Sequence, residues 1–367
     1  MRIDRLDTSV FDVPTDLPGG DGTATWGSNT MVLVEAVAES GQRGLGYTYG
    51  AAAAGALIRD ELAELVQGRC VDDVRGAWHA MVAAVRNAGR PGVAATAISA
   101  VDMACWDLKA KVAGQSLFTH LGACRSSVPI YGSGGLTTYT ETQLVQQLQA
   151  WVEQGIPRVK MKIGKDLGES GRQDLDRVAV VRSAIGDDPA LFVDANGAYS
   201  GKQAVRQAEA LAGSGVSYFE EPVSSDRPEE LARVRRDVPM DVAAGEYGWG
   251  PWCLHALLQA GAVDILQADA TRCLGVTGWL MAADLAYAAG IPFSAHCAPA
   301  IHAHLGCVAP QISHLEYFHD HVRLEGMLFE GLPALEAGTL SPDPRRAGLG
   351  LEVRWPDAAR FQVGATA

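Results

Sequence analysis

The sequence has no C-x-x-C motif, no low-complexity segment and no apolar run long enough to span a bilayer. Without such a run we expect no transmembrane helix. The seven cysteines are odd in number and scattered, which predicts reduced, mostly buried thiols rather than a disulfide framework. Residues 1–13 have the pattern of a strand rather than of a signal peptide, so we expect a cytoplasmic protein.

Basic residues are also scarce. The chain has 30 Lys and Arg against 43 Asp and Glu, which gives a net charge of −13. Such a surface disfavours nucleic acid and anionic membranes, so we expect neither as a partner. Hydrophobic residues make up 48% of the chain, which is typical of a folded protein. A length of 367 residues suits a barrel with an added domain better than one compact domain.

Three short apolar runs each lead into a carboxylate. LFVDANG, YFEEP and VAAGE contain Asp194, Glu220 and Glu246, which are spaced 26 residues apart. This interval is about one strand, one helix and two loops, and the carboxyl ends of parallel barrel strands converge on one mouth. Three acids brought together there repel one another unless a cation lies between them, and oxygen ligands favour Mg²⁺ over zinc. The alternative is three solvated acids at the starts of loops.

Strand and helix patterns alternate over most of the chain. Eight runs have strand character: residues 128–132, 158–164, 190–196, 216–222, 240–246, 262–269, 291–296 and 312–316. We therefore predict an α/β fold in which residues 126–322 form a modified (β/α)₈ TIM barrel. Residues 1–125 are predicted to form an N-terminal α+β domain, and residues 323–367 to pack back on it.

Within the N-terminal domain, residues 94–114 show helical spacing and end at a glycine. Asp102 and Asp107 lie on this helix and are interpreted as helix-surface or helix-packing acids.

Two segments of this domain are rich in small residues. Residues 14–29 surround one large aromatic side chain, Trp26, and are predicted to be a functional loop, with a mobile hairpin tip as the alternative. Residues 44–55 read GLGYTYGAAAAG and are interpreted as a second lid loop that carries Tyr47 and Tyr49.

The second predicted barrel strand contains Lys160 and Lys162. Side chains alternate along a strand, so both lysines point to one face while Met161 points to the other. Two ammonium groups on an inward face should lower the pKa of one lysine and make it a usable base near neutral pH. The alternative is a pair of surface lysines on an edge strand.

The last three predicted strands end in Asp269, His296 and Glu316. An aspartate on a neighbouring strand would orient the imidazole, select its tautomer and stabilise its charged form. The alternative for His296 is a structural histidine. Glu316 is predicted to hydrogen-bond to a substrate oxygen.

Together these residues resemble the enolase superfamily, and within it the mandelate racemase group. The resemblance implies the K-x-K motif at Lys160 and Lys162, and metal ligands at the acids of DANG, FEEP and AAGE. It also implies a His296–Asp269 dyad and a hydrogen-bonding carboxyl at Glu316. The stretch GVTGW at 275–279 is similar to the same group. The N-terminal part resembles the group in layout, which implies that it caps the barrel and that its loops select the substrate.

The resemblance implies an Mg²⁺-dependent enzyme that removes the proton α to a carboxylate, a chemistry known for the superfamily. Mg²⁺, Lys160 and Glu316, the last as a hydrogen-bond donor, would stabilise the enediolate, while Lys162 and His296 would address opposite faces of the α-carbon. The outcomes implied are dehydration, racemisation or epimerisation, and cycloisomerisation. A non-catalytic binding protein is the competing class.

We expect a hydro-lyase that dehydrates a monocarboxylate sugar acid (an aldonate) to a 2-keto-3-deoxy acid. No Lys or Arg occurs between Arg5 and Arg43, so the predicted lid lacks a cation for a second carboxylate. The residues expected to bind the substrate are polar or aromatic: Trp26, Asn29, Tyr47, Tyr49, Asn196 and Glu221. The expected partners are a small-molecule carboxylate and further copies of the chain in a homo-oligomer.

Overall fold

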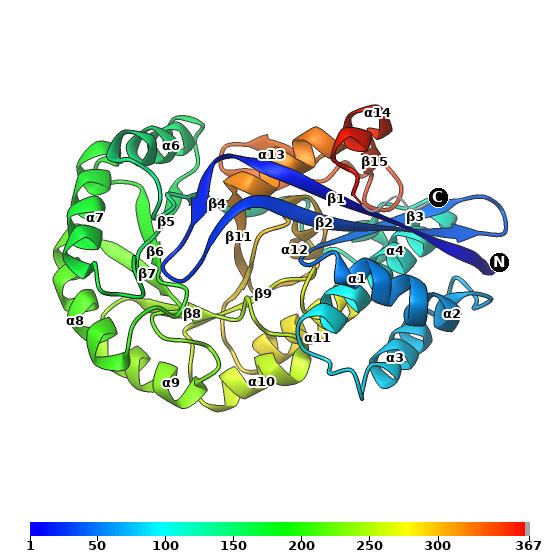
Figure 1. Cartoon of the computed structure of the whole chain (residues 1–367), viewed down its shortest axis with the longest axis horizontal. Coiled ribbons are helices and arrows are strands. Elements are labelled where there is room, and N and C mark those ends of the chain that lie inside the picture. The colour runs from blue at the N-terminus through cyan, green and yellow to red at the C-terminus, as the bar shows by residue number, and fades with distance from the viewer. Residues whose placement is uncertain (364–367) are drawn as a thin grey trace.

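The computed structural model describes residues 1–363. A closed α/β barrel and an N-terminal sheet with its helices lie side by side, and the long β1–β2 hairpin reaches from the sheet to the barrel (Figure 1). This is the capped TIM barrel that the strand pattern and the resemblance predict. The boundaries after residues 125 and 322 stay a prediction.

The N-terminal part is a three-stranded antiparallel sheet covered by helices. Its strands are β1 (Ile3–Gly20), β2 (Thr25–Ala38) and β3 (Arg43–Tyr49). Its helical segments are α1 (Ala53–Leu57), the π-helical turn η1 (Ile58–Leu62), α2 (Ala63–Val66), α3 (Val74–Ala84), α4 (Val93–Val112) and α5 (Leu117–His120). α4 contacts β3 on one side and the barrel helix α11 (Gly275–Ala288) on another, so most of its residues are buried. The helix predicted at 94–114 is confirmed.

The prediction of a second lid loop at 44–55 is wrong. Residues 44–49 belong to β3, which is buried between β2 and α4. The glycines of this strand are there because α4 approaches its backbone closely. A Cβ atom on Gly44 would lie 2.2 Å from the carbonyl oxygen of Ala104, and one on Gly46 would lie 2.1 Å from that of Ala100. The small residues therefore serve helix–sheet packing.

The barrel has eight parallel strands, and it closes where β11 pairs with β4. The strands are β4 (Val128–Gly134), β5 (Arg158–Lys162), β6 (Ala190–Asp194), β7 (Val216–Glu220), β8 (Asp241–Ala244), β9 (Ile265–Ala268), β10 (Phe293–Ala295) and β11 (Ile312–Phe318). The helices between and after them are α6 (Glu141–Glu153), α7 (Gly171–Ile185), α8 (Gly201–Leu211) with the 3₁₀ turn η2 (Ala212–Ser214), α9 (Pro228–Asp237), α10 (Pro251–Gln259), α11, α12 (Pro299–Gly306) and α13 (His319–Leu328). Each of the eight predicted strand segments overlaps one of these strands, and β4 and β11 extend two residues beyond the predicted ends.

The interior of the barrel is filled below the mouth by a layer of aromatic side chains. Tyr131, Phe192 and Tyr218 pack together there, with Phe192 and Tyr218 stacked at 4.5 Å between ring centroids. Lys160 Nζ lies 5.2 Å from the centroid of the Tyr131 ring, directly against this layer. The layer closes the barrel from below, so the polar side chains at the strand ends face only the mouth.

Residues beyond α13 contact both the barrel and the N-terminal sheet. They form β12 (Phe329–Glu330), β13 (Ala334–Glu336), β14 (Thr339–Ser341), β15 (Glu352–Val353), α14 (Trp355–Ala358) and the 3₁₀ turn η3 (Ala359–Phe361). β14 pairs antiparallel with β4, and the Val363 amide donates to the carbonyl of Val10. Phe11 lies against Trp355, with 6.3 Å between ring centroids.

Two buried acids of α4 hold the parts of the chain together. Asp102 accepts hydrogen bonds from the backbone amide and hydroxyl of Thr277 on α11, at 2.9 and 2.7 Å. Asp107 accepts from the amides of Leu45 and Leu349. Both residues are therefore helix-packing acids, one of the two interpretations made from the sequence.

Residues 14–29 are not a loop. They form the far end of the β1–β2 hairpin, with a register shift between Pro14 and Gly19 and a turn at residues 21–24. The tip is anchored to the barrel, because the amides of Thr137 and Leu167 donate to the carbonyls of Gly20 and Gly22. The segment is thus a hairpin that covers the ends of β4 and β5. Of the two interpretations made from the sequence, a loop and a hairpin tip, the hairpin tip agrees with the observed shape.

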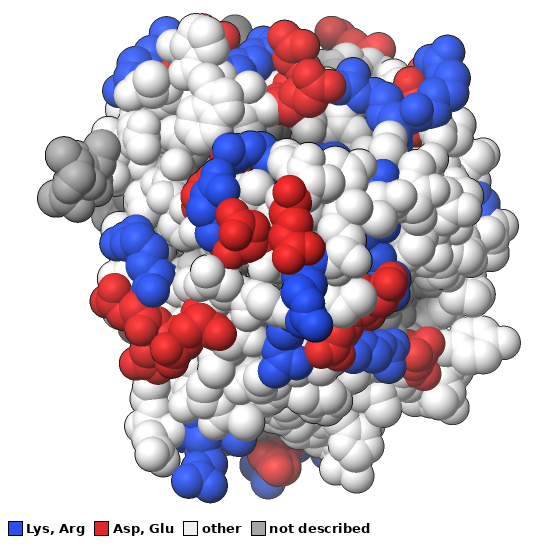
Figure 2. Space-filling view, turned by 90° about the vertical axis from the view of Figure 1, so that its right-hand side faces the viewer, with Lys and Arg blue, Asp and Glu red and all other residues white. Residues whose placement is uncertain are grey.

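Charges of both signs are intermingled on the face that carries the N-terminal sheet (Figure 2). On the strands of this sheet, Arg5 pairs with Asp7, and Arg43 pairs with Asp7 and Glu35, at 3.0–3.2 Å. Within residues 1–363, no helix combines the length and apolarity needed to cross a membrane. All seven cysteines are free thiols, as predicted.

Candidate active site

The ends of the barrel strands carry a ring of charged side chains. Lys162, Asp194 and Glu220 are the last residues of β5, β6 and β7. Glu246, Asp269 and His296 follow β8, β9 and β10, and Glu316 lies within β11. Parallel strands place these positions at the same mouth, as the sequence pattern predicted.

Asp194, Glu220 and Glu246 form a compact acidic cluster. One carboxylate oxygen of each lies within 4.8 Å of the others, and all three residues are buried. Asp194 and Glu220 are direct neighbours in the β6–β7 register. Burial and the nearby charge of Asp194 raise the pKa of Glu220 to about 8. Its Oε1 atom is buried without a hydrogen-bond partner among the described residues, so the donor set fits a hard divalent cation such as Mg²⁺.

Lys160 and Lys162 both point into the barrel, whereas Met161 lies in the surrounding apolar core. Lys160 Nζ lies 2.5 Å from Glu220 Oε2 and 2.8 Å from Glu316 Oε1. Lys162 pairs with Asp194. The alternative of surface lysines on an edge strand is therefore excluded.

The predicted lowering of a lysine pKa is wrong for this arrangement. Burial by itself lowers the pKa of both lysines, but the surrounding carboxylates outweigh it. The negative charges of Glu220 and Glu316 raise the pKa of Lys160 well above its ordinary value. Asp194 does the same for Lys162, against the smaller effect of the Lys160 charge. Carboxylate pairing, rather than repulsion between the two ammonium groups, decides the protonation of both side chains.

His296 and Asp269 form a hydrogen-bonded dyad. Nδ1 of His296 lies 2.8 Å from Asp269 Oδ2, and Nε2 lies 2.9 Å from Glu246 Oε2. The other oxygen of Asp269 accepts 2.7 Å hydrogen bonds from the amide and hydroxyl of Thr271. Burial raises the pKa of Asp269, but the hydrogen bond from His296 and its charge bring it down to about 2. The ionised aspartate thus orients the imidazole and favours its charged form.

Glu316 uses its two oxygens for different partners. Oε1 accepts from Ser133 at 2.6 Å and faces Lys160. Oε2 accepts the backbone amide of Cys297 at 3.0 Å and lies 3.7 Å from His296 Nε2. Burial raises the pKa of Glu316, but Lys160 and His296 lower it well below its ordinary value. The carboxylate is therefore ionised in this arrangement and not a hydrogen-bond donor.

A pocket of about 270 Å³ opens above these residues. From the barrel it is lined by Lys162, Asn196, Glu246, Tyr247, Arg272, His296, Cys297, Glu316, Phe318 and His321. The hairpin closes the other side with Asp21, Ala24, Trp26 and Asn29. The hairpin is thus part of the wall of the pocket, which agrees with its predicted lid role.

Trp26 and Asn29 line the pocket but share a protein acceptor. Trp26 Nε1 and Asn29 Nδ2 both donate to Asp320 Oδ2, at 3.3 and 3.1 Å. Asp320 is buried at the N-terminus of α13, next to His319, which pairs with Asp16 of the hairpin at 2.9 Å. These contacts fasten the hairpin over the barrel.

Tyr47 and Tyr49 do not line this pocket, so the predicted substrate contacts are wrong. Both belong to the buried strand β3. The Tyr47 hydroxyl donates to Glu325 at 2.6 Å. Tyr49 is stacked on His321, with 3.5 Å between ring centroids. Tyr49 therefore supports a residue of the pocket wall from behind, and Tyr47 joins the N-terminal sheet to α13.

The other two expected substrate residues differ in position. Asn196 lines the pocket and has a positive φ of 47°, and its Oδ1 atom has no hydrogen-bond partner in the described part of the chain. Glu221 does not line the pocket. It is buried behind the acidic cluster, where burial and the charges of Glu246 and Asp194 raise its pKa well above the ordinary value.

Sequence reasoning missed Arg272, Cys297 and His302. Arg272 NH1 lies 3.7 Å from Glu246 Oε1 and Nε lies 3.7 Å from Asp269 Oδ2, and the side chain is about one-fifth exposed to the pocket. Its place three residues after the dyad aspartate is the only sequence signal that pointed to it. His302 accepts the amide of Ala270 at Nε2 and contacts the carbonyl of Cys297 at Nδ1, so it links the loops that carry both dyad residues.

Comparison with known proteins agrees with this geometry. Residues 5–122 match the family model "Mandelate racemase / muconate lactonizing enzyme, N-terminal domain", and residues 143–358 match "Enolase C-terminal domain-like". The chain belongs to the mandelate racemase/muconate lactonizing enzyme family. Homologues in this family are sugar-acid dehydratases, cycloisomerases and racemases, so this chain is an enzyme of the enolase superfamily.

Three members of the mandelate racemase/muconate lactonizing enzyme family illustrate the range. A D-galactarolactone cycloisomerase from Agrobacterium fabrum is 32% identical over 81% of this chain and 78% of its own. A mandelate racemase/muconate lactonizing enzyme-like protein from Rubrobacter xylanophilus is 49% identical, with a TM-score of 0.95 over 99% of this chain and all of its own. The L-talarate/galactarate dehydratase of Salmonella typhimurium, crystallised with Mg and L-lyxarohydroxamate, is 28% identical, with a TM-score of 0.90 over 99% and 93% of the two chains.

Proposed function

We propose that this enzyme removes the proton α to the carboxylate of a sugar acid and eliminates water to give a 2-keto-3-deoxy acid. The observation that carries the proposal is the arrangement of two acid–base groups around one pocket. Lys162 comes from β5 and His296 follows β10, and both line the pocket with Glu316 of β11 between their strands. A substrate in the pocket would have one group on each side of its α-carbon.

Asp194, Glu220 and Glu246 would hold one Mg²⁺. When bound, the ion would supply positive charge to the substrate carboxylate and weaken the hold of Asp194 on the Lys162 proton. The fit rests on the oxygen-only donor set and on the Oε1 atom of Glu220, which has no hydrogen-bond partner within residues 1–363. Family structures with bound magnesium support the same assignment.

Each remaining group has a separate task. Lys162 Nζ would take the α-proton, and the charge of Lys160 would stabilise the negative charge that develops. His296 would deliver a proton from Nε2 to the departing hydroxyl group. Asp269 would hold the imidazole and stabilise its charged form. Glu316, ionised and tied to Ser133 and Lys160, would position these groups.

The charges on the pocket wall narrow the proposed substrate class from sugar acids in general to those with one carboxylate. The argument from a cation-free lid does not extend to the whole pocket, because the barrel supplies Arg272. However, Arg272 already faces two carboxylates, and the hairpin adds the anionic side chain of Asp21 to the opposite wall. An additional substrate carboxylate near Asp21 would be repelled. We therefore propose a monocarboxylate substrate whose hydroxyl groups meet Trp26 and Asn29.

A cycloisomerase is the second candidate. Two relatives support it: the D-galactarolactone cycloisomerase, and a 3,6-anhydro-α-L-galactonate cycloisomerase that is 29% identical over 99% of this chain. The same two acid–base groups would serve, with a ring oxygen or an internal hydroxyl in place of the departing water. The masses of the products separate the two candidates.

The test is a library of aldonates, anhydro-aldonates, lactones and aldarates, incubated with enzyme and Mg²⁺. We expect loss of one water and formation of a keto acid from an aldonate. Only mass-neutral products would overturn the dehydratase assignment. Aldarate turnover without aldonate turnover would overturn the monocarboxylate argument, and Arg272→Gln and Asp21→Asn would then identify which wall binds the second carboxylate.

A further inference from the structure

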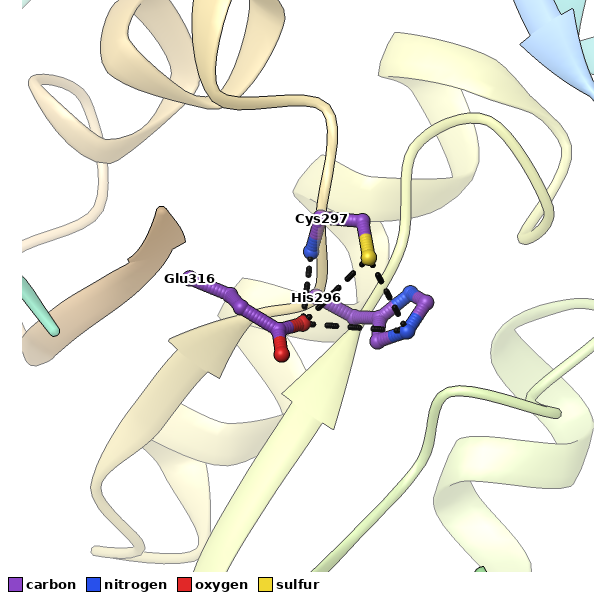
Figure 3. A group of neighbouring side chains, drawn as sticks. All are labelled: His296, Cys297 and Glu316. Atoms are coloured by element: carbon purple, nitrogen blue, oxygen red, sulfur yellow. Dashed lines mark hydrogen bonds and ion pairs between the residues drawn. The ribbon is translucent and has the colours of Figure 1, made fainter. Parts of the chain in front are cut away.

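Three side chains beside the acid–base dyad present three different donor atoms to one point of the pocket. They are His296 Nε2, Cys297 Sγ and Glu316 Oε2 (Figure 3). The imidazole and the thiol come from adjacent residues after β10, and the carboxylate reaches them from β11. All three residues are at least nine-tenths buried, yet all three line the pocket.

The spacing of these atoms fits a tetrahedral metal ion. Nε2 and Sγ are 3.2 Å apart, Sγ and Oε2 are 3.4 Å apart, and Nε2 and Oε2 are 3.7 Å apart. Zinc bonds of about 2.0 Å to nitrogen or oxygen and about 2.3 Å to sulfur, at tetrahedral angles, place donor atoms roughly 3.3–3.5 Å apart. Shifts of a few tenths of an ångström would therefore complete three of the four positions, and water from the pocket would take the fourth.

The chemistry of the donors distinguishes this cluster from the acidic one. Asp194, Glu220 and Glu246 offer only oxygens, which suit Mg²⁺. A thiolate and an imidazole are softer ligands that select zinc and its neighbours in the first transition row. Two ions of different character would thus find adjacent sites on one pocket, because Glu246 Oε2 lies 2.9 Å from His296 Nε2.

The surrounding residues hold two of the ligands in position. Asp269 is bonded to Nδ1 of His296, the arrangement in which a carboxylate supports a metal-bound histidine, and Nε2 lies 2.9 Å from Glu246 Oε2 of the acidic cluster. Ser133 and Lys160 hold Glu316 through Oε1, while Oε2 accepts the backbone amide of Cys297 at 3.0 Å and faces the cluster. This support exists independently of the cysteine, so the site does not depend on the thiol alone.

We propose that His296, Cys297 and Glu316 form a second, inhibitory metal site that takes Zn²⁺. Zinc would replace the thiol proton, which passes to solvent, and would occupy the nitrogen that the proposed reaction needs for proton transfer. No redox change is involved. A bound zinc ion would hold the enzyme inactive while Mg²⁺ remains at the acidic cluster. The inhibition rests on the proposed function, whereas the binding does not.

Binding is tested with Co²⁺ as a spectroscopic substitute for zinc, added to enzyme that is saturated with Mg²⁺. We expect one equivalent of Co²⁺ to give the near-ultraviolet absorption of a cobalt–thiolate bond, and Zn²⁺ to displace it. Cys297→Ala should abolish this band, and Cys253→Ser, a partly buried cysteine on α10 outside the pocket, should keep it. A spectrum without the thiolate band, or a band that survives in Cys297→Ala, would overturn the proposal.

Inhibition is tested by zinc titration of turnover at a fixed, saturating Mg²⁺ concentration. We expect inhibition that a tenfold rise in Mg²⁺ does not relieve. Cys297→Ala lacks one of the four zinc ligands. The zinc concentration that halves its own zinc-free rate should therefore be roughly 100-fold higher than the concentration that halves the rate of the native enzyme. Two results together would place zinc at the acidic cluster and refute the second site. They are a zinc inhibition that falls in proportion to the Mg²⁺ concentration, and equal zinc inhibition of the native enzyme and Cys297→Ala. If the substrate screen fails, the cobalt measurement still decides the binding.

Discussion

Replacing Asp269 by asparagine should separate the two acid–base groups of the site. The substitution keeps the shape of the side chain and changes its charge and its hydrogen-bonding pattern. Thr271 donates two hydrogen bonds to Oδ1, so the amide oxygen of the introduced asparagine must take that position. The amide NH₂ then faces Nδ1 of His296, where Oδ2 was 2.8 Å away. The imidazole is forced to accept at Nδ1 and to carry its proton on Nε2.

The energetic effect can be worked from the pKa of Asp269. Against the effect of burial, contact with His296 brings this pKa from 3.8 to about 2. This lowering of the pKa corresponds to about 2–3 kcal/mol of net stabilisation of the carboxylate, to which His296 contributes more than Arg272 and His302. Losing this stabilisation and adopting the wrong tautomer should together lower kcat by about 10³- to 10⁴-fold, as in other carboxylate–histidine pairs.

The assay follows two signals in deuterated water with Mg²⁺ present: product formation, and exchange of the substrate α-proton by NMR. We expect product formation to fall while exchange through Lys162 persists. Asp264→Asn is the matched control. Asp264 lies just before β9, at the end of that strand opposite Asp269, and pairs with Arg235 at 2.7 Å. Its replacement should change kcat by less than about twofold.

Two results would contradict this reasoning. A kcat for Asp269→Asn within about tenfold of the native value would mean that the tautomer of His296 does not matter. Loss of exchange together with product formation would mean that Lys162 does not take the α-proton by itself.

Three further changes test other parts of the structure. Glu220→Gln should weaken Mg²⁺ binding, measured by calorimetry, by at least ~100-fold, which is the upper end of the cost of losing a residue that supports a metal ligand. Full activity in the presence of a chelator would refute the metal assignment. Asp320→Ala should raise KM about tenfold with a smaller change in kcat, because Trp26 and Asn29 of the hairpin lose their shared acceptor. An unchanged KM would show that other contacts hold the hairpin. Asp102→Ala should lower the free energy of unfolding, measured in urea, by about 2–4 kcal/mol, because Thr277 loses the acceptor of two buried hydrogen bonds. A change within about 0.5 kcal/mol, the size expected for a surface substitution, would contradict the packing role of Asp102.

The barrel and most of its charged ring could be predicted from the sequence, because both depend on local, repeating properties. An apolar run that ends in an acid specifies a strand and the mouth at which that acid lies. Alternation along a strand specifies that Lys160 and Lys162 share a face. These relations hold over a few residues, so Asp194, Glu220, Glu246, Asp269 and His296 could be found without coordinates.

Only the tertiary structure decided which residues face the pocket and which are buried behind it. Glycines suggested a loop at 44–55, but they occur because α4 packs against the backbone of β3, a contact between segments more than fifty residues apart. The same contact takes Tyr47 away from the pocket. Arg272 enters it because of the turn that follows β9, and Cys297 reaches Glu316 because two strands are adjacent in space. The protonation of the lysines depends on distances to carboxylates from other strands, because electrostatic interactions are governed by separation in space and not along the chain.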